Sequence, residues 1–320
     1  MKQRIILAGG SGFLGTALAR RFAARGDEVV VLTRAPKPRA DGVREVSWDA
    51  KSAGEWASLV DGAGVVLNLT GKSVDCRYTE KNRRAIIASR VDSTRAIGEA
   101  IARSSKPPRV WLNASSATLY KHAPDRPTDE SGPTGGTPDA HDEFSVEVIR
   151  EWERALDEAH TPETRKIALR ITMVFGPTAG VFPVLRRLTR FGLGGKMGSG
   201  RQFVSWIHEE DFCRAIEWLI ERGDLSGPVN LAAPNPLTNA EMMRLMRRAC
   251  GMPIGLPATE WMLEIGAFFL RTETELILKS RRIVPGRLLA SGFQFRFPTL
   301  ENALRDLSAY SHMGRPHRVD

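Results

Sequence analysis

The residues most capable of chemistry stand near the start of the chain, where Gly9, Gly10, Gly12 and Gly15 follow one another closely. They fit the spacing G-x-x-G-x-x-G from the first glycine and G-x-G-x-x-G from the second. A strand-to-helix turn without side chains lets a pyrophosphate approach free N–H groups and the positive end of the helix dipole. The sequence therefore predicts a dinucleotide-binding loop formed by Gly9, Gly10, Ser11, Gly12, Phe13, Leu14 and Gly15.

A βαβ unit must surround these glycines if they are to bind a dinucleotide. Residues 4–8 and 28–33 are short apolar runs typical of buried parallel strands, and residues 13–25 carry apolar side chains at helical spacing. Further strands are predicted at 64–69, 109–114 and 166–171, with helices near 80–103 and 143–159. This alternation predicts an α/β fold, a Rossmann-like doubly wound parallel sheet.

The end of the second predicted strand indicates which dinucleotide binds. An NAD site usually places Asp or Glu there to bond the ribose 2′-hydroxyl, whereas this sequence reads Thr33-Arg34, with Lys37 and Arg39 close behind. A guanidinium attracts a 2′-phosphate and a carboxylate repels it. We therefore predict NADP(H) as the cofactor, contacted by Thr33 and Arg34; the alternative is that Arg34 is a solvated surface arginine.

Composition narrows the class of protein. The 320 residues are 42% hydrophobic and 26% charged, and no apolar run reaches the roughly 18 residues of a membrane span. We expect a cytoplasmic protein without a membrane partner. The distant cysteines Cys76, Cys213 and Cys250 suggest buried free thiols and no disulfide framework. Since no His/Cys/Asp cluster has ligand spacing, we predict no metal.

The formal net charge of +9 is compatible with several anionic partners. Lys and Arg are dispersed without an aromatic-interleaved basic tract, so nucleic acid is not an expected partner. A negatively charged cofactor and an anionic small-molecule substrate account for this charge.

The strict alternation lapses after about residue 176, which predicts two domains. We assign 1–176 to an NADP(H)-binding Rossmann domain and 177–310 to a smaller mixed α/β substrate domain, with some interleaving and a tail at 311–320. The Pro- and Gly-rich stretch 121–142 is expected to shape a pocket. Within the second domain, Trp261–Leu270 suggests a buried core helix, and Phe293, Phe295 and Phe297 alternate as in a strand.

Several further segments carry a family resemblance that runs nearly end to end. They are Asn68-Leu69-Thr70-Gly71, Ser89-Arg90, Ser115 to Tyr120, Arg170 to Pro177, Ser205 to His208 with Asp211, Ala233 to Asn239, Pro285 to Leu289, Gly292 to Phe295 and Phe297-Pro298. With the glycine loop, they resemble the extended short-chain dehydrogenase/reductase superfamily, specifically its sugar-nucleotide-epimerase-like (NAD-dependent epimerase/dehydratase) branch with a C-terminal domain of unknown function. The resemblance implies NADP(H) and the cytosol, but no particular substrate. It adds Asn68, Leu69, Thr70, Gly71, Arg90, Ser115 and Arg170 to the expected cofactor contacts.

The same resemblance implies a catalytic Ser, a Tyr, and a Lys four residues after the Tyr. Ser116 matches the serine that polarises the substrate oxygen, although a turn or capping role is the alternative. The Y-x-x-x-K pair is absent, because the corresponding helix reads Phe144 to Glu153 without tyrosine. Of the three tyrosines, Tyr120 lies nearest and could replace the missing acid/base or simply pack a pocket wall.

Substrate contacts are expected around the glycine-rich stretch 194–201. Lys196 and Arg201, with Arg186 and Arg187, could neutralise a diphosphate, and Trp206 and His208 follow in the segment that lies over the substrate in the superfamily. The alternatives are solvated surface charges and, for His208, a packed histidine bonded to backbone. Asp211 is expected to cap the next helix, and Arg90 could instead form a surface ion pair.

Three hypotheses follow for the function. The leading one is an NADP(H)-dependent epimerase-like protein or oxidoreductase acting on a nucleotide sugar or another anionic small molecule. The missing Tyr and Lys favour a second, an NADP(H)-binding sensor without turnover. A third is a scaffold that the cofactor merely stabilises. A monomer or homodimer is expected.

Overall fold

The computed structural model describes residues 2–123, 125–137, 142–259, 262 and 279–309. The chain divides into two compact units that alternate along the sequence. Unit 1 comprises Met1–Leu119, Glu143–Ile171 and Cys213–Val229, and unit 2 comprises Tyr120–Asp142, Thr172–Phe212 and Asn230–Asp320. The division into domains at residues 176 and 177 remains a prediction.

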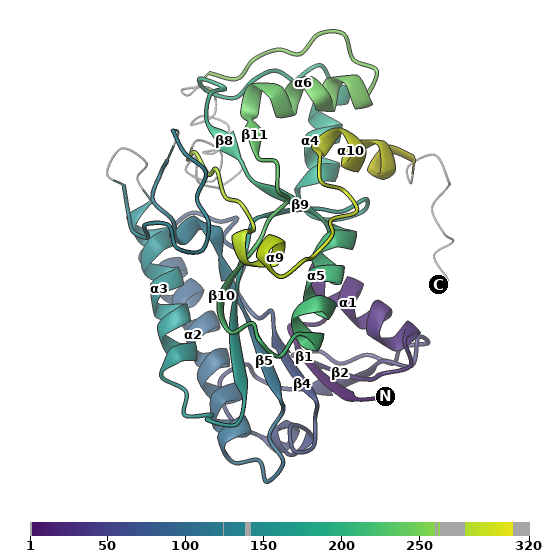
Figure 1. Cartoon of the computed structure of the whole chain (residues 1–320), viewed down its shortest axis with the longest axis vertical. Coiled ribbons are helices and arrows are strands. Elements are labelled where there is room, and N and C mark those ends of the chain that lie inside the picture. Colours follow the sequence, from purple (N-terminus) through teal and green to yellow (C-terminus); the bar gives the residue numbers. More distant parts are fainter. Residues whose placement is uncertain (1, 124, 138–141, 260–261, 263–278, 310–320) are drawn as a thin grey trace. The chain divides into compact units, whose positions relative to one another are not determined.

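Unit 1 is built on a seven-stranded sheet of order β10-β6-β5-β4-β1-β2-β3 (Figure 1). The strands are β1 (Arg4–Ala8), β2 (Glu28–Thr33), β3 (Arg44–Ser47), β4 (Val65–Asn68), β5 (Val110–Ser116), β6 (Arg165–Ile171) and β10 (Gly227–Leu231). The pairings from β3 across to β6 are all parallel. The predicted Rossmann-like doubly wound fold is therefore confirmed, and the five strands predicted from apolar runs are all present, with ends shifted by at most two residues.

Helices cover both faces of this sheet (Figure 1), which is why its strands are apolar on both sides. They are α1 (Phe13–Ala24), α2 (Glu80–Ala102), α3 (Glu143–Asp157) and α5 (Glu209–Glu221), with short 3₁₀ turns η1 (Glu55–Leu59) and η2 (Ala117–Leu119). Helix α2 packs against α3, and its Ile97 and Ile101 share a buried core with Trp111 of β5. On the opposite face α1 contacts α5, where Arg21 pairs with Glu217 at 2.8 Å.

The order of the strands fixes where a ligand can bind. After β1 the chain adds β2 and β3 on one side, then crosses back to place β4 on the other side of β1. Ala8 is paired with both Leu32 and Asn68, so the loops after β1, β2 and β4 leave the same edge of the sheet. In open α/β sheets this topological switch point is where ligands bind.

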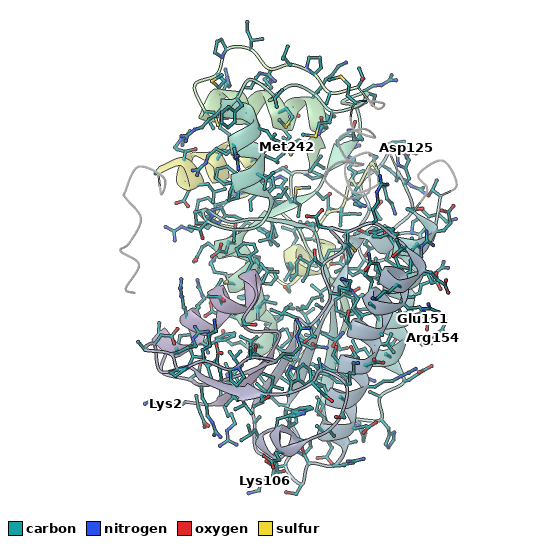
Figure 2. The ribbon with its side chains drawn as sticks, turned by 180° about the vertical axis from the view of Figure 1, so that it is seen from behind. Lys2, Lys106, Asp125, Glu151, Arg154 and Met242 are labelled. Carbon is teal, nitrogen blue, oxygen red and sulfur yellow. The ribbon has the colours of Figure 1, made fainter. Side chains whose placement is uncertain are left out.

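Unit 2 has its own core. It contains α4 (Val181–Arg190), α6 (Asn239–Ala249), α9 (Gly286–Ala290), α10 (Leu300–Ala309) and two small sheets, β7 (Met173–Phe175) with β9 (Trp206–His208) and β8 (Phe203–Val204) with β11 (Leu237–Thr238). Met242, labelled in Figure 2, belongs to the α6 face that packs with α4 and α10 in this core. No helix of the described part of the chain is long and apolar enough to cross a membrane.

Three expectations for unit 2 and the cysteines need correction. Phe293, Phe295 and Phe297 form no strand; the first two rings instead pack edge to face at 4.8 Å. Asp211 does not cap α5 but lies inside it, and its carboxylate accepts hydrogen bonds from the N–H groups of Arg296 and Phe297 at 2.8 and 2.7 Å.

Among the thiols, Cys213 is buried but Cys76 and Cys250 are only half-buried. All three are free, as expected. The core helix predicted at Trp261–Leu270 lies outside the described residues, apart from Met262.

Candidate functional site

The glycine loop after β1 contains three positions where the protein itself excludes a side chain. Gly9 has φ +73°, and a Cβ there would lie 2.9 Å from the backbone nitrogen of Thr70. A Cβ on Gly10 would lie 2.7 Å from the Cγ2 of Val31. A Cβ on Gly15 would lie 2.4 Å from the Cα of Gly10, because the first turn of α1 packs directly on the loop. These three glycines are required by packing, whether or not a ligand binds.

Gly12 is different, because nothing in the protein requires it to be glycine. Its φ is −78°, and the only atom near a Cβ there is the carbonyl oxygen of Gly9 at 3.5 Å. Gly12 is the N-cap of α1 and makes no side-chain cap, so the first N–H groups of the helix have no cap from it. The exposed pair Ser11-Gly12 thus leaves an open, positively polarised helix end suited to a phosphate.

Two exposed cations, Arg34 and Lys37, follow the end of β2. Thr33 is buried, and its hydroxyl lies 3.4 Å from that of Ser11. Arg34 is exposed and pairs with no carboxylate of the described residues. Arg39, which the sequence grouped with it, is held by Asp41 at 2.5 Å and Glu45 at 3.3 Å; the hydrogen bond that Arg39 donates to Asp41 is the main cause that raises the Arg39 pKa. Arg34, and not Arg39, is available for a phosphate.

Asn68, expected to touch the cofactor, has a side-chain amide that is bonded to other residues of the protein. Its side chain is completely buried at the end of β4 and donates to Asn113 Oδ1 at 2.8 Å. Its own Oδ1 accepts the N–H of Thr70 at 3.0 Å. Because these partners enclose the amide, Asn68 holds the loop in which Leu69 and Thr70 are half-buried and Gly71 is exposed.

Arg90 lies beside that loop and is not a surface arginine. Its Nη1 donates to the carbonyls of Lys72 and Ile86 at 3.1 and 3.0 Å, and its guanidinium sits 5.0 Å above the Trp152 ring. Burial lowers the Arg90 pKa to about 10. The alternative of a surface ion pair is wrong for the described residues, because carbonyls and an aromatic ring, not a carboxylate, hold this cation.

Ser115 and Arg170, also expected at the cofactor, are both bonded to Glu153 of α3. The Ser115 hydroxyl donates to Glu153 at 2.5 Å, and Arg170 forms a two-pronged ion pair with the same carboxylate at 2.9 Å for each contact. Arg170 and Glu153 are 8% and 16% exposed. The three residues tie α3 to β5 and β6, and a cofactor contact of Ser115 or Arg170 stays a prediction. A carboxylate is one common partner of a buried arginine, so the acidic residues of the helix that follows β5 were the place to look for one.

Changing Glu153 to glutamine is expected to lower the free energy of unfolding by about 3 kcal/mol, because it removes the carboxylate from a largely buried arginine. Urea unfolding followed by circular dichroism measures this. Glu151→Gln on the same helix is the matched control, since Glu151 pairs at 3.0 Å with the exposed Arg154 (Figure 2) and should contribute less than about 1 kcal/mol. Equal losses in the free energy of unfolding would show that the buried ion pair stabilises the fold no more than the exposed one.

In unit 2, the predicted substrate residues divide into two kinds. Lys196 and Arg201 are exposed on the glycine-rich loop, which Asn239 fixes through the N–H of Met197 at 2.8 Å. Trp206 and His208 are buried among core residues, and their contact with substrate stays a prediction.

His208 is packed and bonded to backbone, which was the alternative to a substrate contact. His208 Nδ1 accepts the N–H of Glu210 at 3.0 Å, and its ring lies 4.1 Å from that of Phe297. Burial lowers the pKa of His208 against the opposing effect of Asp306, 3.4 Å away. No group of three or more His, Cys, Asp or Glu side chains in the described ranges is placed to hold a metal.

Comparison with known proteins bears on this geometry. The NAD dependent epimerase/dehydratase family matches residues 5–232. The chain belongs to this family. A domain of unknown function, DUF1731, matches residues 258–307, so the expected two-part resemblance is confirmed. "Epimerase family protein SDR39U1" from Homo sapiens is 30% identical over 96% of this chain and 100% of its own length, and "Epimerase family protein YfhF" from Bacillus subtilis is 30% identical over 95% and 98%.

A solved structure extends the comparison from sequence to fold. The crystal structure of human epimerase family protein SDR39U1 (isoform 2) with NADPH has a TM-score of 0.84 and 29% identity, covering 96% of this chain and 99% of that one.

The catalytic positions of this epimerase/dehydratase family member depart from the superfamily pattern. Ser116, half-buried at the end of β5, accepts the N–H of Thr118 at 3.2 Å and so also serves the turn there. Helix α3 contains no tyrosine, and its second residue is the buried Phe144. Tyr120 is 1% exposed and donates to Asn230 at 2.8 Å. This placement favours the packing interpretation of Tyr120 over a role as acid/base.

Proposed function

We propose that this epimerase/dehydratase family member binds NADP(H) at the carboxyl edge of the sheet in unit 1. The open α1 N-terminus at Gly12 is the observation that carries the proposal, since packing does not explain that glycine. The exposed Arg34 next to it adds selectivity for a 2′-phosphate. The human relative of similar length, whose crystal structure contains NADPH, supports the choice of NADP(H) over NAD(H).

Each group of residues has a distinct task in this proposal. The N–H groups at the start of α1 receive the diphosphate, Arg34 and Thr33 bind the ribose phosphate end, and Leu69, Thr70 and Gly71 line the adjoining wall. Asn68 and the Ser115–Glu153–Arg170 cluster hold these parts in place. Arg90 supplies positive charge beside Gly71. The nicotinamide, when bound, supplies a hydride acceptor or donor.

For the chemical step, we propose Ser116 as the donor that polarises a substrate carbonyl or hydroxyl oxygen. An anionic small molecule, such as a nucleotide sugar, is the proposed substrate class. The exposed Lys196 and Arg201 of unit 2 would neutralise it. We retain the cytoplasm as the proposed location, and a monomer or homodimer as the proposed state.

A second function is supported by a specific observation. Helix α3 carries neither the tyrosine nor the lysine of the superfamily, and the Tyr120 hydroxyl is paired inside the core. A chain that binds NADP(H) but lacks a proton donor would act as a sensor, changing its stability or partners when the dinucleotide binds.

The test is calorimetric titration of cofactor-free protein with NADPH and with NADH, together with mass spectrometry of small molecules that copurify. Selective NADPH binding with a retained anionic metabolite that turns over would support the enzyme. Selective binding without turnover of any such metabolite would support the sensor. Failure to bind either dinucleotide would overturn both.

A further inference from the structure

Unit 2 presents a concentrated group of exposed apolar side chains. Of the seven large hydrophobic residues that the described part of the chain exposes, five lie in two stretches, residues 184–193 in and after α4 and residues 254–256 in the loop after α6. They are Val184, Phe191, Leu193, Ile254 and Leu256, and between 49% and 73% of each is exposed. We call these five residues the apolar face.

The two stretches form one continuous surface. The N–H of Leu256 donates to the carbonyl of Gly192 at 2.8 Å, and the N–H of Gly195 donates to the carbonyl of Leu256 at 3.1 Å. Val184 and Phe191 stand seven positions apart, about two helical turns, and so leave α4 on the same side. Because α4 also packs against α6 within unit 2, the face is held by its own hydrogen bonds and helix packing.

The surroundings of the apolar face are positively charged. The sequence has no Asp or Glu between residues 176 and 208, and residues 249–259 carry no charge at all. Arg187 and Arg190 are exposed on α4, and neither pairs with a carboxylate of a described residue. Large apolar side chains beside uncompensated arginines are typical of surfaces that lie in the headgroup region of an anionic membrane.

We infer that the apolar face docks peripherally on an anionic lipid bilayer. Phe191 and Ile254, the most exposed of the five at 72% and 73%, enter the acyl boundary, and Arg187 and Arg190 meet lipid phosphates. A second copy of the chain fits less well, since it would bring the same positive charges together. The sequence-based expectation of no membrane partner rested on the absence of a spanning run. It could not detect a face assembled from two separate segments.

Vesicle flotation of the full chain tests this inference. Binding is expected to vesicles of phosphatidylcholine mixed with phosphatidylglycerol, to be much weaker with phosphatidylcholine alone, and to fall as salt rises. The double variant Phe191→Ser/Ile254→Ser should bind at least about tenfold more weakly, because it loses the apolar anchors. Arg187→Glu/Arg190→Glu should also lose at least about tenfold, through charge reversal.

Matched controls separate the face from general effects. Leu289→Ser removes a side chain that is 47% exposed on α9, outside the apolar face. Arg84→Glu/Arg103→Glu makes the same change in net charge on α2, where both arginines are more than 70% exposed. Both controls should bind the mixed vesicles as the parent does.

Three results would overturn the inference. The first is that the parent does not float with the anionic vesicles. The second is that the face variants and their controls bind equally. The third is a dimer in sedimentation velocity that Phe191→Ser/Ile254→Ser abolishes, which would assign the face to a second copy. NADPH titration is independent of these results, because all of the substitutions lie outside the proposed cofactor site.

Discussion

Replacing Arg34 with aspartate is expected to weaken NADPH binding about 100-fold, because a charge-assisted bond to the 2′-phosphate worth about 3 kcal/mol becomes a repulsion. NADH lacks that phosphate, so its affinity should change by less than about threefold. The exposed guanidinium has no carboxylate partner among the described residues, so its removal should leave the fold undisturbed. Calorimetric titration with both dinucleotides measures the difference.

Arg84→Asp provides the control for this experiment. It makes the same charge change on a side chain that is 74% exposed on α2, so it reports the effect of net charge alone. NADPH affinity should stay close to that of the parent in this variant. If Arg34→Asp weakened both dinucleotides equally, Arg34 would have no role in recognising the 2′-phosphate.

The second large effect is expected from Gly12→Val. A Cβ at Gly12 meets no protein atom closer than 3.5 Å and the φ of −78° suits any residue, so the free energy of unfolding should fall by no more than about 1 kcal/mol, the usual cost of an apolar residue at an N-cap. The valine methyls would, however, occupy the space in which a diphosphate meets the α1 N-terminus. Affinity for both NADPH and NADH should fall at least about 30-fold, a loss of about 2 kcal/mol.

Gly15→Ala serves as the comparison, because it is expected to lower the stability of the fold and not to block the diphosphate directly. Its Cβ would lie 2.4 Å from the Cα of Gly10, so the loop and helix must separate, at a cost of about 3 kcal/mol in the free energy of unfolding. Urea unfolding and dinucleotide titration of the two variants therefore separate a ligand-facing glycine from a packing glycine. Unchanged dinucleotide affinity in a folded Gly12→Val protein would remove the main support for the proposed site.

Local patterns in the sequence were sufficient for much of unit 1. The apolar runs at 4–8 and 28–33 became β1 and β2 with the predicted bounds, and the helix predicted over 13–25 ends one residue earlier. Such elements can be predicted because strands buried on both faces must be apolar throughout and a covering helix must repeat near 3.6 residues. The short edge strand β3, Arg44–Ser47, was missed because its residues are polar and partly exposed.

The hydrogen-bond partners of the site residues could not be predicted from the sequence. Asn68, Ser115 and Arg170 stand at strand ends, as the sequence indicated, but their side chains bond to Asn113 and Glu153. A linear pattern identifies which residues reach the carboxyl edge of a sheet. It does not show whether a polar side chain there turns towards a ligand or satisfies a buried partner.

The sequence by itself determined the doubly wound fold, the glycine loop and the arginine after β2, because each depends on residues close together in the chain. Only the tertiary structure decided that Gly12 is open while Gly15 is packed, that Trp206 and His208 belong to the core, and that two separate segments build the apolar face. These features depend on contacts between residues distant in sequence, where burial and partner choice are set by packing and not by local propensity.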